Sequence, residues 1–259
     1  MLLPFVATLQ EPPYKLVWHD EFSRDGAPDP ANWSYEEGFV RNKELQLYRK
    51  ENVRVEKGRL IIEGRREKVP NPDYDPSSKD WRKERPDADY TSGCVITRGK
   101  REFRFGRFEI RAKIVADKGL WPAIWTLGTI GPWPKNGEVD LLEYYQDTIL
   151  ANTCWGNGTW NTQKHPYPSF TAKDPKWADK YHVWRMDWDE AWIRIYLDGQ
   201  IVNETDLSKT LNPDGTNPFH NPQYLLLNLA IGSTGGDPSG TEFPSRYEID
   251  YVRVYQRRS

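Results

Sequence analysis

The sequence predicts an all-β protein built as a sandwich or jelly roll of antiparallel sheets. Many short segments of the 259-residue chain alternate apolar and polar side chains, as half-buried strands do, and none has the period of a long helix. The 20 prolines and 19 glycines are spread between these segments, where they favour turns. No linker or change in composition divides the chain, so we expect residues 14–259 to form a single domain.

Strands account for most of the first half of the chain. Residues 104–114 alternate cleanly, and residues 42–48 place their even-numbered polar side chains on one face. That face suits either the recognition of sugar hydroxyls or an ordinary solvated edge. Residues 69–89, rich in proline and charge, predict a long surface loop. The strands expected here are residues 14–22, 42–48, 52–55, 59–63, 90–97 and 104–114.

The second half of the chain predicts further strands separated by turns. Residues 119–127 are apolar almost throughout, which indicates a strand that is buried on both sides or lines a cleft. Trp121 and Trp125 share one face of it, as core residues or as a platform for sugar rings. Residues 156–176 predict a polar, aromatic loop. The strands expected here are residues 119–127, the acidic segment within 133–145, and residues 149–156, 181–188, 192–197, 224–231 and 247–255.

Composition excludes several classes of function. A net charge of −2 gives no indication of binding to nucleic acid or anionic membranes, and no apolar run reaches the ~20 residues that span a bilayer. The four histidines are scattered, without the spacing of a zinc site. The 12 tryptophans suit the binding of sugar rings, although core packing uses many of them. Cys94 and Cys154 allow at most one disulfide, which leaves the redox compartment open.

Residues 1–13 are expected to form a tail outside the domain. Residues 1–10 are apolar but short, and they lack the basic start of a signal peptide. They suit either the remnant of a trimmed signal peptide or a segment added for expression.

Three acids, Glu138, Asp140 and Glu143, stand in an otherwise apolar strand. Because side chains alternate along a strand, Glu138 and Asp140 share a face, whereas Glu143 would point into the core. A β-bulge near Leu141 and Leu142 would return Glu143 to the face of the other two acids. Neighbouring acids push their pKa values apart, which suits the two carboxylates of a retaining glycosidase. A surface strand with scattered acids is the alternative.

The chain resembles glycoside hydrolase family 16, in particular its laminarinase-like group. The resemblance covers roughly residues 14–255 and rests on motifs that occur in the order found in that family. Several ordered matches are much more specific than any one of them. The motifs are WHDEF at 18–22, NKELQLY at 42–48, FGRFEIRAK at 105–113, GLWPAIW at 119–125, GEVDLLE at 137–143 and DYVRVY at 250–255.

The resemblance implies a β-jelly-roll sandwich of two curved antiparallel sheets, with a substrate cleft across the concave sheet. It implies retaining, endo-acting hydrolysis of β-linked glucans or galactans, with no cofactor for catalysis. By motif position, Glu138 would be the nucleophile, Asp140 its assisting acid and Glu143 the general acid/base. The residues expected to contact substrate by motif position are Asn42, Trp121, Trp125 and Trp133, with Trp155 and the basic Arg98 as further candidates.

Many members of the family also hold a calcium ion on the convex side. Here the ligands would be the carboxylates of Glu21 and Asp250 and the backbone carbonyl of Gly58. Oxygen ligands suit calcium, and the ion would have a structural role. Two ordinary surface acids are the alternative interpretation.

Two departures from the family pattern leave the substrate open. Residues 151–156 lack a histidine, and residues 232–236 lack a tryptophan, that laminarinase-like members often carry. Three hypotheses follow: an endoglucanase for β-1,3- or mixed β-1,3/1,4-glucan, an endo-acting galactanase of the agarase, porphyranase or carrageenase type, or a non-catalytic carbohydrate-binding domain. The resemblance also implies a monomer that is secreted, periplasmic or on the cell surface. Basic residues that could meet a sulfated galactan are Arg41, Lys43, Arg98 and Lys100.

Overall fold

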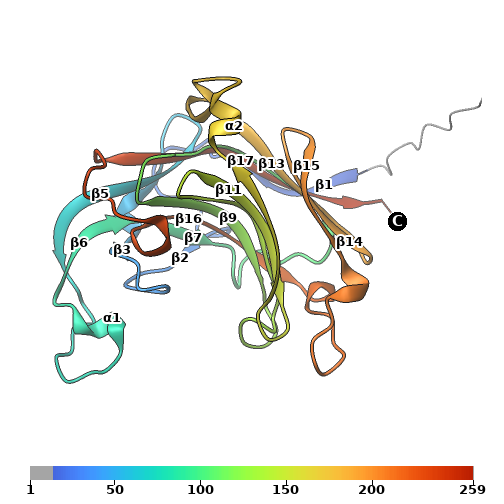
Figure 1. The fold of residues 1–259 in the computed structure, drawn as a ribbon, viewed down its shortest axis with the longest axis horizontal. Coiled ribbons are helices and arrows are strands. Elements are labelled where there is room, and N and C mark those ends of the chain that lie inside the picture. Colours follow the sequence, from blue (N-terminus) through green and yellow to red (C-terminus); the bar gives the residue numbers. More distant parts are fainter. Residues whose placement is uncertain (1–13, 259) are drawn as a thin grey trace, which may run out of the picture.

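The computed structural model describes residues 14–258, which form two packed β-sheets (Figure 1). The larger sheet contains β1 (Tyr14–Asp20), β3 (Gln46–Tyr48), β4 (Val53–Val55), β5 (Leu60–Pro70), β6 (Asp87–Ser92), β8 (Gly106–Lys113), β13 (His182–Trp188), β14 (Trp192–Leu197), β15 (Gln200–Asp206) and β17 (Ser245–Arg257). The smaller sheet contains β2 (Ser34–Tyr35), β7 (Cys94–Ile96), β9 (Leu120–Gly128), β10 (Glu138–Tyr145), β11 (Thr148–Trp155), β12 (Thr159–Pro166) and β16 (Gln223–Ile231).

The strand order mixes distant parts of the chain. The larger sheet runs β15-β14-β13-β8-β17-β5-β6-β3, with β1 joined to β17 and β4 to β5, and the smaller runs β12-β11-β10-β9-β16-β7-β2. Among these strands only β3 and β6 pair in parallel. The predicted all-β jelly-roll sandwich is therefore confirmed. The expected tail, residues 1–13, lies outside the described residues.

Helical structure is limited to single turns in the described part of the chain. None of these helices is long and apolar enough to cross a membrane. The turns are α1 (Trp81–Glu84), α2 (Pro168–Thr171), η1 (Lys50–Asn52), η2 (Trp177–Asp179), η3 (Leu207–Lys209), η4 (Pro218–His220) and η5 (Ser233–Gly235).

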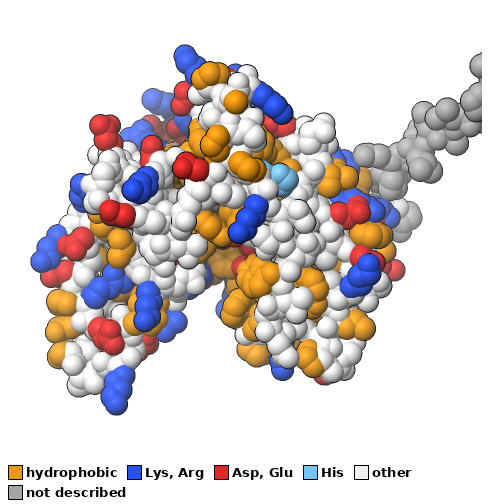
Figure 2. Space-filling model, viewed as in Figure 1, with side chains coloured by type: hydrophobic (Ala, Val, Ile, Leu, Met, Phe, Trp, Pro, Cys, Tyr) orange, Lys and Arg blue, Asp and Glu red, His pale blue; other side chains and the backbone are white. Residues whose placement is uncertain are grey.

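The core fills the space between the two sheets. Ile110 and Val252 from the larger sheet and Ile124 and Leu227 from the smaller one are fully buried in one continuous cluster. Full burial of such a side chain is worth roughly 1.5–3 kcal/mol, so this interface dominates stability. The other face of the smaller sheet is different, because there the molecule is hollowed between two lobes (Figure 2).

The chain crosses from one sheet to the other at Gly93. The sequence predicts one strand over residues 90–97, but β6 ends at Ser92 and β7 begins at Cys94 in the opposite sheet. A Cβ atom at Gly93 would lie 2.3 Å from Cγ2 of Val53. Only glycine lets the backbone pass this close to the core.

Three further segments differ from the predicted elements. Residues 42–48 form a strand only from Gln46, because Asn42 and Lys43 have φ angles of 54° and 51° in a left-handed turn. The expected loop 69–89 contains the end of β5, α1 and the start of β6. The expected loop 156–176 contains β12, an eight-residue edge strand whose mostly polar side chains hide its alternation.

Candidate active site

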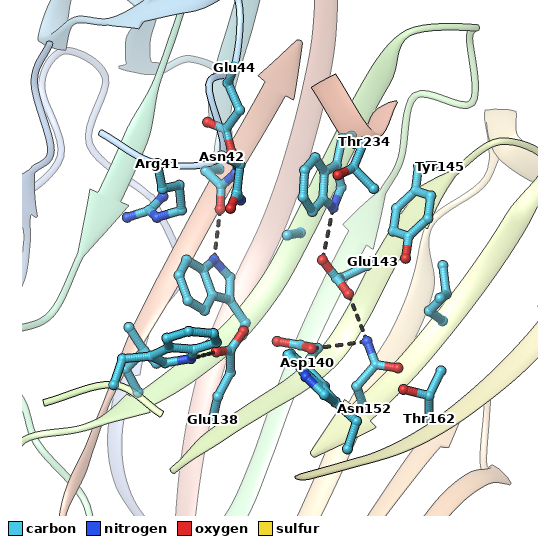
Figure 3. A pocket seen from close by; sticks show the side chains of 18 of the residues that line it. Arg41, Asn42, Glu44, Glu138, Asp140, Glu143, Tyr145, Asn152, Thr162 and Thr234 are labelled. Atoms are coloured by element: carbon cyan, nitrogen blue, oxygen red, sulfur yellow. Dashed lines mark hydrogen bonds between the residues drawn. The ribbon is translucent and has the colours of Figure 1, made fainter. Parts of the chain in front are cut away.

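A cleft of about 770 Å³ lies on the outer face of the smaller sheet. Its floor is formed by side chains of β9, β10, β11, β12 and β16, and the segment before β3 forms one wall (Figure 3). Arg82 of α1 also reaches the cleft, and its Nε donates a hydrogen bond of 3.0 Å to the carbonyl of Val40. Because the floor extends over five strands, the cleft can hold a long ligand that crosses them.

The predicted bulge in β10 is confirmed. Asp140 pairs with Asn152 of β11, yet the next pair is Glu143 with Leu150, so the register shifts between the two acids. On the β9 side the shift falls between Asp140 and Leu142. Leu141 and Leu142 are both fully buried, and all three acids line the cleft. The bulge therefore keeps a charged group out of the core.

Glu143 is held by two neutral donors. Nε1 of Trp121 donates to Oε1 at 2.9 Å, and Nδ2 of Asn152 donates to Oε2 at 2.7 Å (Figure 3). Burial, followed by repulsion from Glu138, raises the pKa of Glu143 to about 8 despite these hydrogen bonds. Its carboxyl is therefore protonated at neutral pH and can donate a proton.

Asp140 and Glu138 complete the acidic row. Burial first, then repulsion by Glu143 and Glu138, raises the pKa of Asp140 well above its usual range. Burial also raises the pKa of Glu138, but hydrogen bonds from the indole of Trp133 and from Asp140 oppose this. A protonated Asp140 beside Glu138 favours the charged form of Glu138. The row can therefore hold one anion, Glu138, at one end and two neutral acids, Asp140 and Glu143, beside it.

The wall opposite Glu143 is a buried polar network. Nε1 of Trp125 donates to Oδ1 of Asn228 at 2.7 Å, and Nδ2 of Asn228 donates to the Tyr48 hydroxyl at 3.0 Å. Nδ2 of Asn42 donates to Oε1 of the buried Glu44 at 3.1 Å. These bonds fix the indole of Trp125 and the amide of Asn42 before any ligand binds.

Comparison with known proteins agrees with this geometry. The model of the family described as Glycosyl hydrolases family 16 matches residues 32–253. The chain belongs to this family.

Relatives in family 16 cover nearly the whole chain. A beta-glucanase of Rhodothermus marinus is 34% identical over 95% of this chain and 86% of its own length. The glucan endo-1,3-beta-glucosidase A1 of Niallia circulans is 31% identical over 94% of this chain, which spans 38% of that longer protein.

Solved structures of the family superpose closely. The catalytic domain of a laminarinase from Thermotoga petrophila has a TM-score of 0.80 at 32% identity, covering 96% of this chain and 100% of that one. A structure reported with endo-acting O-glycanases of human gut bacteria has a TM-score of 0.86 at 35% identity, covering 95% and 91% of the two chains.

Four of the six expected substrate-contacting residues line the cleft. They are Asn42, Trp121, Trp125 and Trp133. The prediction is wrong for Trp155, which is half-buried and packs its ring against Phe219 at 6.4 Å in the core. It is also wrong for Arg98, which is exposed outside the cleft lining, with its guanidinium 5.5 Å from the ring of Tyr224. In β11 the even-numbered Leu150 and Asn152 line the cleft, so the odd-numbered Trp155 faces the other way, toward the core.

Several cleft residues of this family 16 protein have no signal in the sequence. The sequence did not single out Asn152, which stands in an apolar strand, although its amide donates hydrogen bonds to Asp140 and Glu143. The missed residues of β12 are Trp160, Thr162 and Lys164. Of the basic residues named for a sulfated ligand, Arg41 lines the cleft, whereas Lys43 and Lys100 do not belong to its described lining.

The residues named for calcium lie on the outer face of the larger sheet. Both carboxylate oxygens of Glu21 accept bonds of 2.8 Å from Arg253, and Asp250 accepts one from Arg111. In this arrangement they do not fit a calcium ion, because each carboxylate would first have to leave its arginine. The described residues contain no group of three or more His, Cys, Asp or Glu side chains placed to hold a metal. Calcium binding stays a prediction.

Both cysteines are buried free thiols, so no disulfide joins them. Sγ of Cys94 donates a hydrogen bond of 3.1 Å to Glu36, which also pairs with Arg41 at the cleft wall. Cys154 pairs across the strands with Glu138, and burial raises the pKa of its thiol to about 12. Neither thiol is a reactive nucleophile at neutral pH.

Proposed function

We propose that this protein is a retaining endo-β-glucanase that cleaves β-1,3-glucan or mixed-linkage β-1,3/1,4-glucan. The observation that carries the proposal is the bulge in β10, which brings Glu138, Asp140 and Glu143 to one cleft with unequal affinities for protons. The family 16 relatives named as beta-glucanase and glucan endo-1,3-beta-glucosidase support the choice of substrate.

The first step forms a covalent intermediate. The carboxylate of Glu138 attacks the anomeric carbon, while Glu143 gives its proton to the departing glycosidic oxygen. A pKa of about 8 keeps Glu143 protonated for this step at neutral pH. The bond to the leaving sugar breaks, and a glycosyl ester on Glu138 remains.

The second step releases the sugar. Glu143, now ionised, removes a proton from a water molecule, whose oxygen attacks the same anomeric carbon and displaces Glu138. The hydrogen bond from Asp140 favours the charged form of Glu138, so it assists departure of the carboxylate when the ester breaks. Two inversions at one carbon give net retention.

A second candidate is an endo-acting β-galactosidase. The structure reported with O-glycanases has a TM-score of 0.86, and the keratan-sulfate endo-1,4-beta-galactosidase of Sphingobacterium multivorum is 28% identical over 94% of this chain. Arg41, Arg82 and Lys164 line the cleft and could meet a sulfated chain. A non-catalytic carbohydrate-binding role is less consistent with three acids kept together at the cost of mutual repulsion.

A polysaccharide screen tests the proposal. We expect reducing sugar from laminarin or mixed-linkage barley glucan, with the β-anomer of the new end appearing first by ¹H NMR. Release only from agarose, carrageenan or keratan sulfate would favour the second candidate. No release from any of these polymers, or an initial α-anomer, would refute a retaining glycosidase.

Location and assembly belong to the same proposal. A glucan polymer is too large to enter a cell, so we infer action in the periplasm, at the cell surface or in the medium. One chain holds all three acids and the cleft around them, so a monomer suffices for the proposed chemistry. Fractionation of the native host and size-exclusion chromatography with light scattering test the two statements.

A further inference from the structure

β12 presents a regular row of side chains to the cleft. Trp160, Thr162 and Lys164 alternate along the strand and all line the cavity. Because strand side chains alternate between faces, the residues between them point away from it. The row therefore faces the same space as the acids.

The opposite side of β12 is fastened to the larger sheet. Nδ2 of Asn161 donates to Oδ1 of Asn203 at 3.0 Å and to Oγ1 of Thr205 at 2.9 Å. A ring nitrogen of His165 bonds the carbonyl of Val202 at 2.9 Å. These contacts hold the edge strand against β15, so the orientation of the row toward the cleft is set before a ligand arrives.

The exposure of Trp160 is unusual in this molecule. All twelve tryptophans lie within the described residues, and only Trp133 and Trp160 are exposed, at 56% and 45% of their surface. Both line the cleft. Edge strands are normally protected by charged or polar residues, and an exposed indole that faces a cleft is free to stack on a ligand.

Trp160, Thr162 and Lys164 lie on the opposite side of the three acids from Asn42. Glu138 pairs with Cys154, which in turn pairs with Trp160, so two strand spacings of about 4.8 Å separate Trp160 from β10. Figure 3 shows Thr162 on the far side of Asn152 from Arg41 and Asn42. A chain bound across the acids would meet the Asn42 wall on one side and β12 on the other.

We propose that β12 forms a sugar-binding subsite for the part of the β-linked glucan that extends past the acids. The indole of Trp160 stacks on the apolar face of one sugar ring. The Thr162 hydroxyl and the Lys164 ammonium bond sugar hydroxyls beside it. This inference rests on the proposed function and adds a second binding region to it.

The test is a chain-length series of β-1,3-linked gluco-oligosaccharides. For Trp160→Ala, kcat/KM on long oligosaccharides should fall about tenfold, equivalent to roughly 1.4 kcal/mol, and stay within about twofold on the shortest one cleaved. Trp160→Phe keeps a flat ring and should recover most of the loss. End-labelled substrates should also show a shift in the bonds that the alanine variant cleaves.

The matched control is Trp192→Ala, which removes a half-buried indole from β14 in the larger sheet. It should change kcat/KM by the same factor at every length. Equal activity of Trp160→Ala and wild type at every length, or a uniform loss, would overturn the subsite. Failure of the wild type to cleave any length would instead overturn the proposed function.

Discussion

On the outer face of the larger sheet, acids pair with arginines, as Glu21 does with Arg253 and Asp187 with Arg107. In the cleft, Glu138 and Glu143 accept hydrogen bonds from neutral indoles instead. Hydrogen bonding to Arg253 lowers the pKa of Glu21, whereas burial raises the pKa of both cleft glutamates. Glu21 on one face is thus permanently charged, whereas Glu143 on the other holds a proton that it can donate.

This contrast has a physical cause. In a part-buried ion pair the arginine favours the charged form of its acid, which stays ionised near neutral pH. A cluster of buried acids without cationic hydrogen-bond partners can hold few charges at once, so protons are distributed unevenly among its members. Stability is favoured by the first arrangement and proton transfer by the second.

The largest effect is expected from removal of the nucleophile. Glu138→Ala should lower kcat on the order of 10⁴-fold, because the glycosyl ester cannot form. Added azide should then attack the substrate directly and give an α-glycosyl azide. In Glu143→Ala, azide should attack the ester and give the β-glycosyl azide. NMR of the products distinguishes the two.

Asp187→Asn is the control for this pair, since Asp187 lies on the outer face of the larger sheet and should leave kcat unchanged. The roles assigned to the two glutamates are wrong if both variants give the same azide anomer, or if Glu138→Ala keeps a tenth of the wild-type rate.

The pH profile should respond to the indole that bonds Glu143. Activity needs Glu143 protonated, so kcat/KM should fall as pH rises through about 8. The Trp121 hydrogen bond lowers the pKa of Glu143, so Trp121→Phe should raise it and move the alkaline limb to higher pH. Trp155→Phe, outside the cleft, should not move it. An unchanged or lowered alkaline limb in Trp121→Phe contradicts the assignment.

Thermal stability should change in opposite directions on the two faces. The pKa of folded Glu143 exceeds its ordinary 4.5, so the stability that its neutral form contributes below pH 4.5 is lost as pH rises to about 8. The variant Glu143→Gln cannot ionise, so at pH 9 its Tm should lie a few degrees above that of wild type. About 1 kcal/mol shifts Tm by ~2–4 °C. At pH 5 the Tm values of the two proteins should be closer together.

Glu21→Gln should show the reverse. The lowered pKa of Glu21 contributes stability above its ordinary 4.5 that is lost as pH falls through the folded value. This variant should melt below wild type at pH 7, with a difference that shrinks in acid. Differential scanning calorimetry at three pH values measures both variants, and shifts of the same sign would remove the contrast between the faces.

Calcium should have the smallest effect. Since Glu21 and Asp250 are each held by an arginine, we expect Tm to be the same in EDTA and in millimolar calcium. Isothermal titration with calcium provides a second measure. A clear rise in Tm with calcium, absent in Asp250→Asn, would show that the carboxylates leave their arginines for the ion.

Local patterns allowed much of the site to be predicted. Strict alternation placed residues 104–114 and 247–255 in strands, and the odd spacing of Glu143 required a bulge. β12 was missed, because a strand whose exposed side chains are mostly polar on both faces resembles a loop. The turn at Asn42 was missed because a left-handed φ in a non-glycine residue leaves no pattern in a run of polar residues.

The sequence by itself determined the β-class and the three acids, because alternation with a period of two is local to each strand. It also indicated their common face, because Glu143 breaks that alternation and only a bulge keeps its charge out of the core. The tertiary structure alone decided which side chains meet the acids and therefore where their protons lie. Asn152 and Trp121 belong to neighbouring strands, and their bonds to Glu143 exist only once β9, β10 and β11 pair in register. Burial by the same sheet raises the pKa of Glu143, since desolvation depends on everything packed around it.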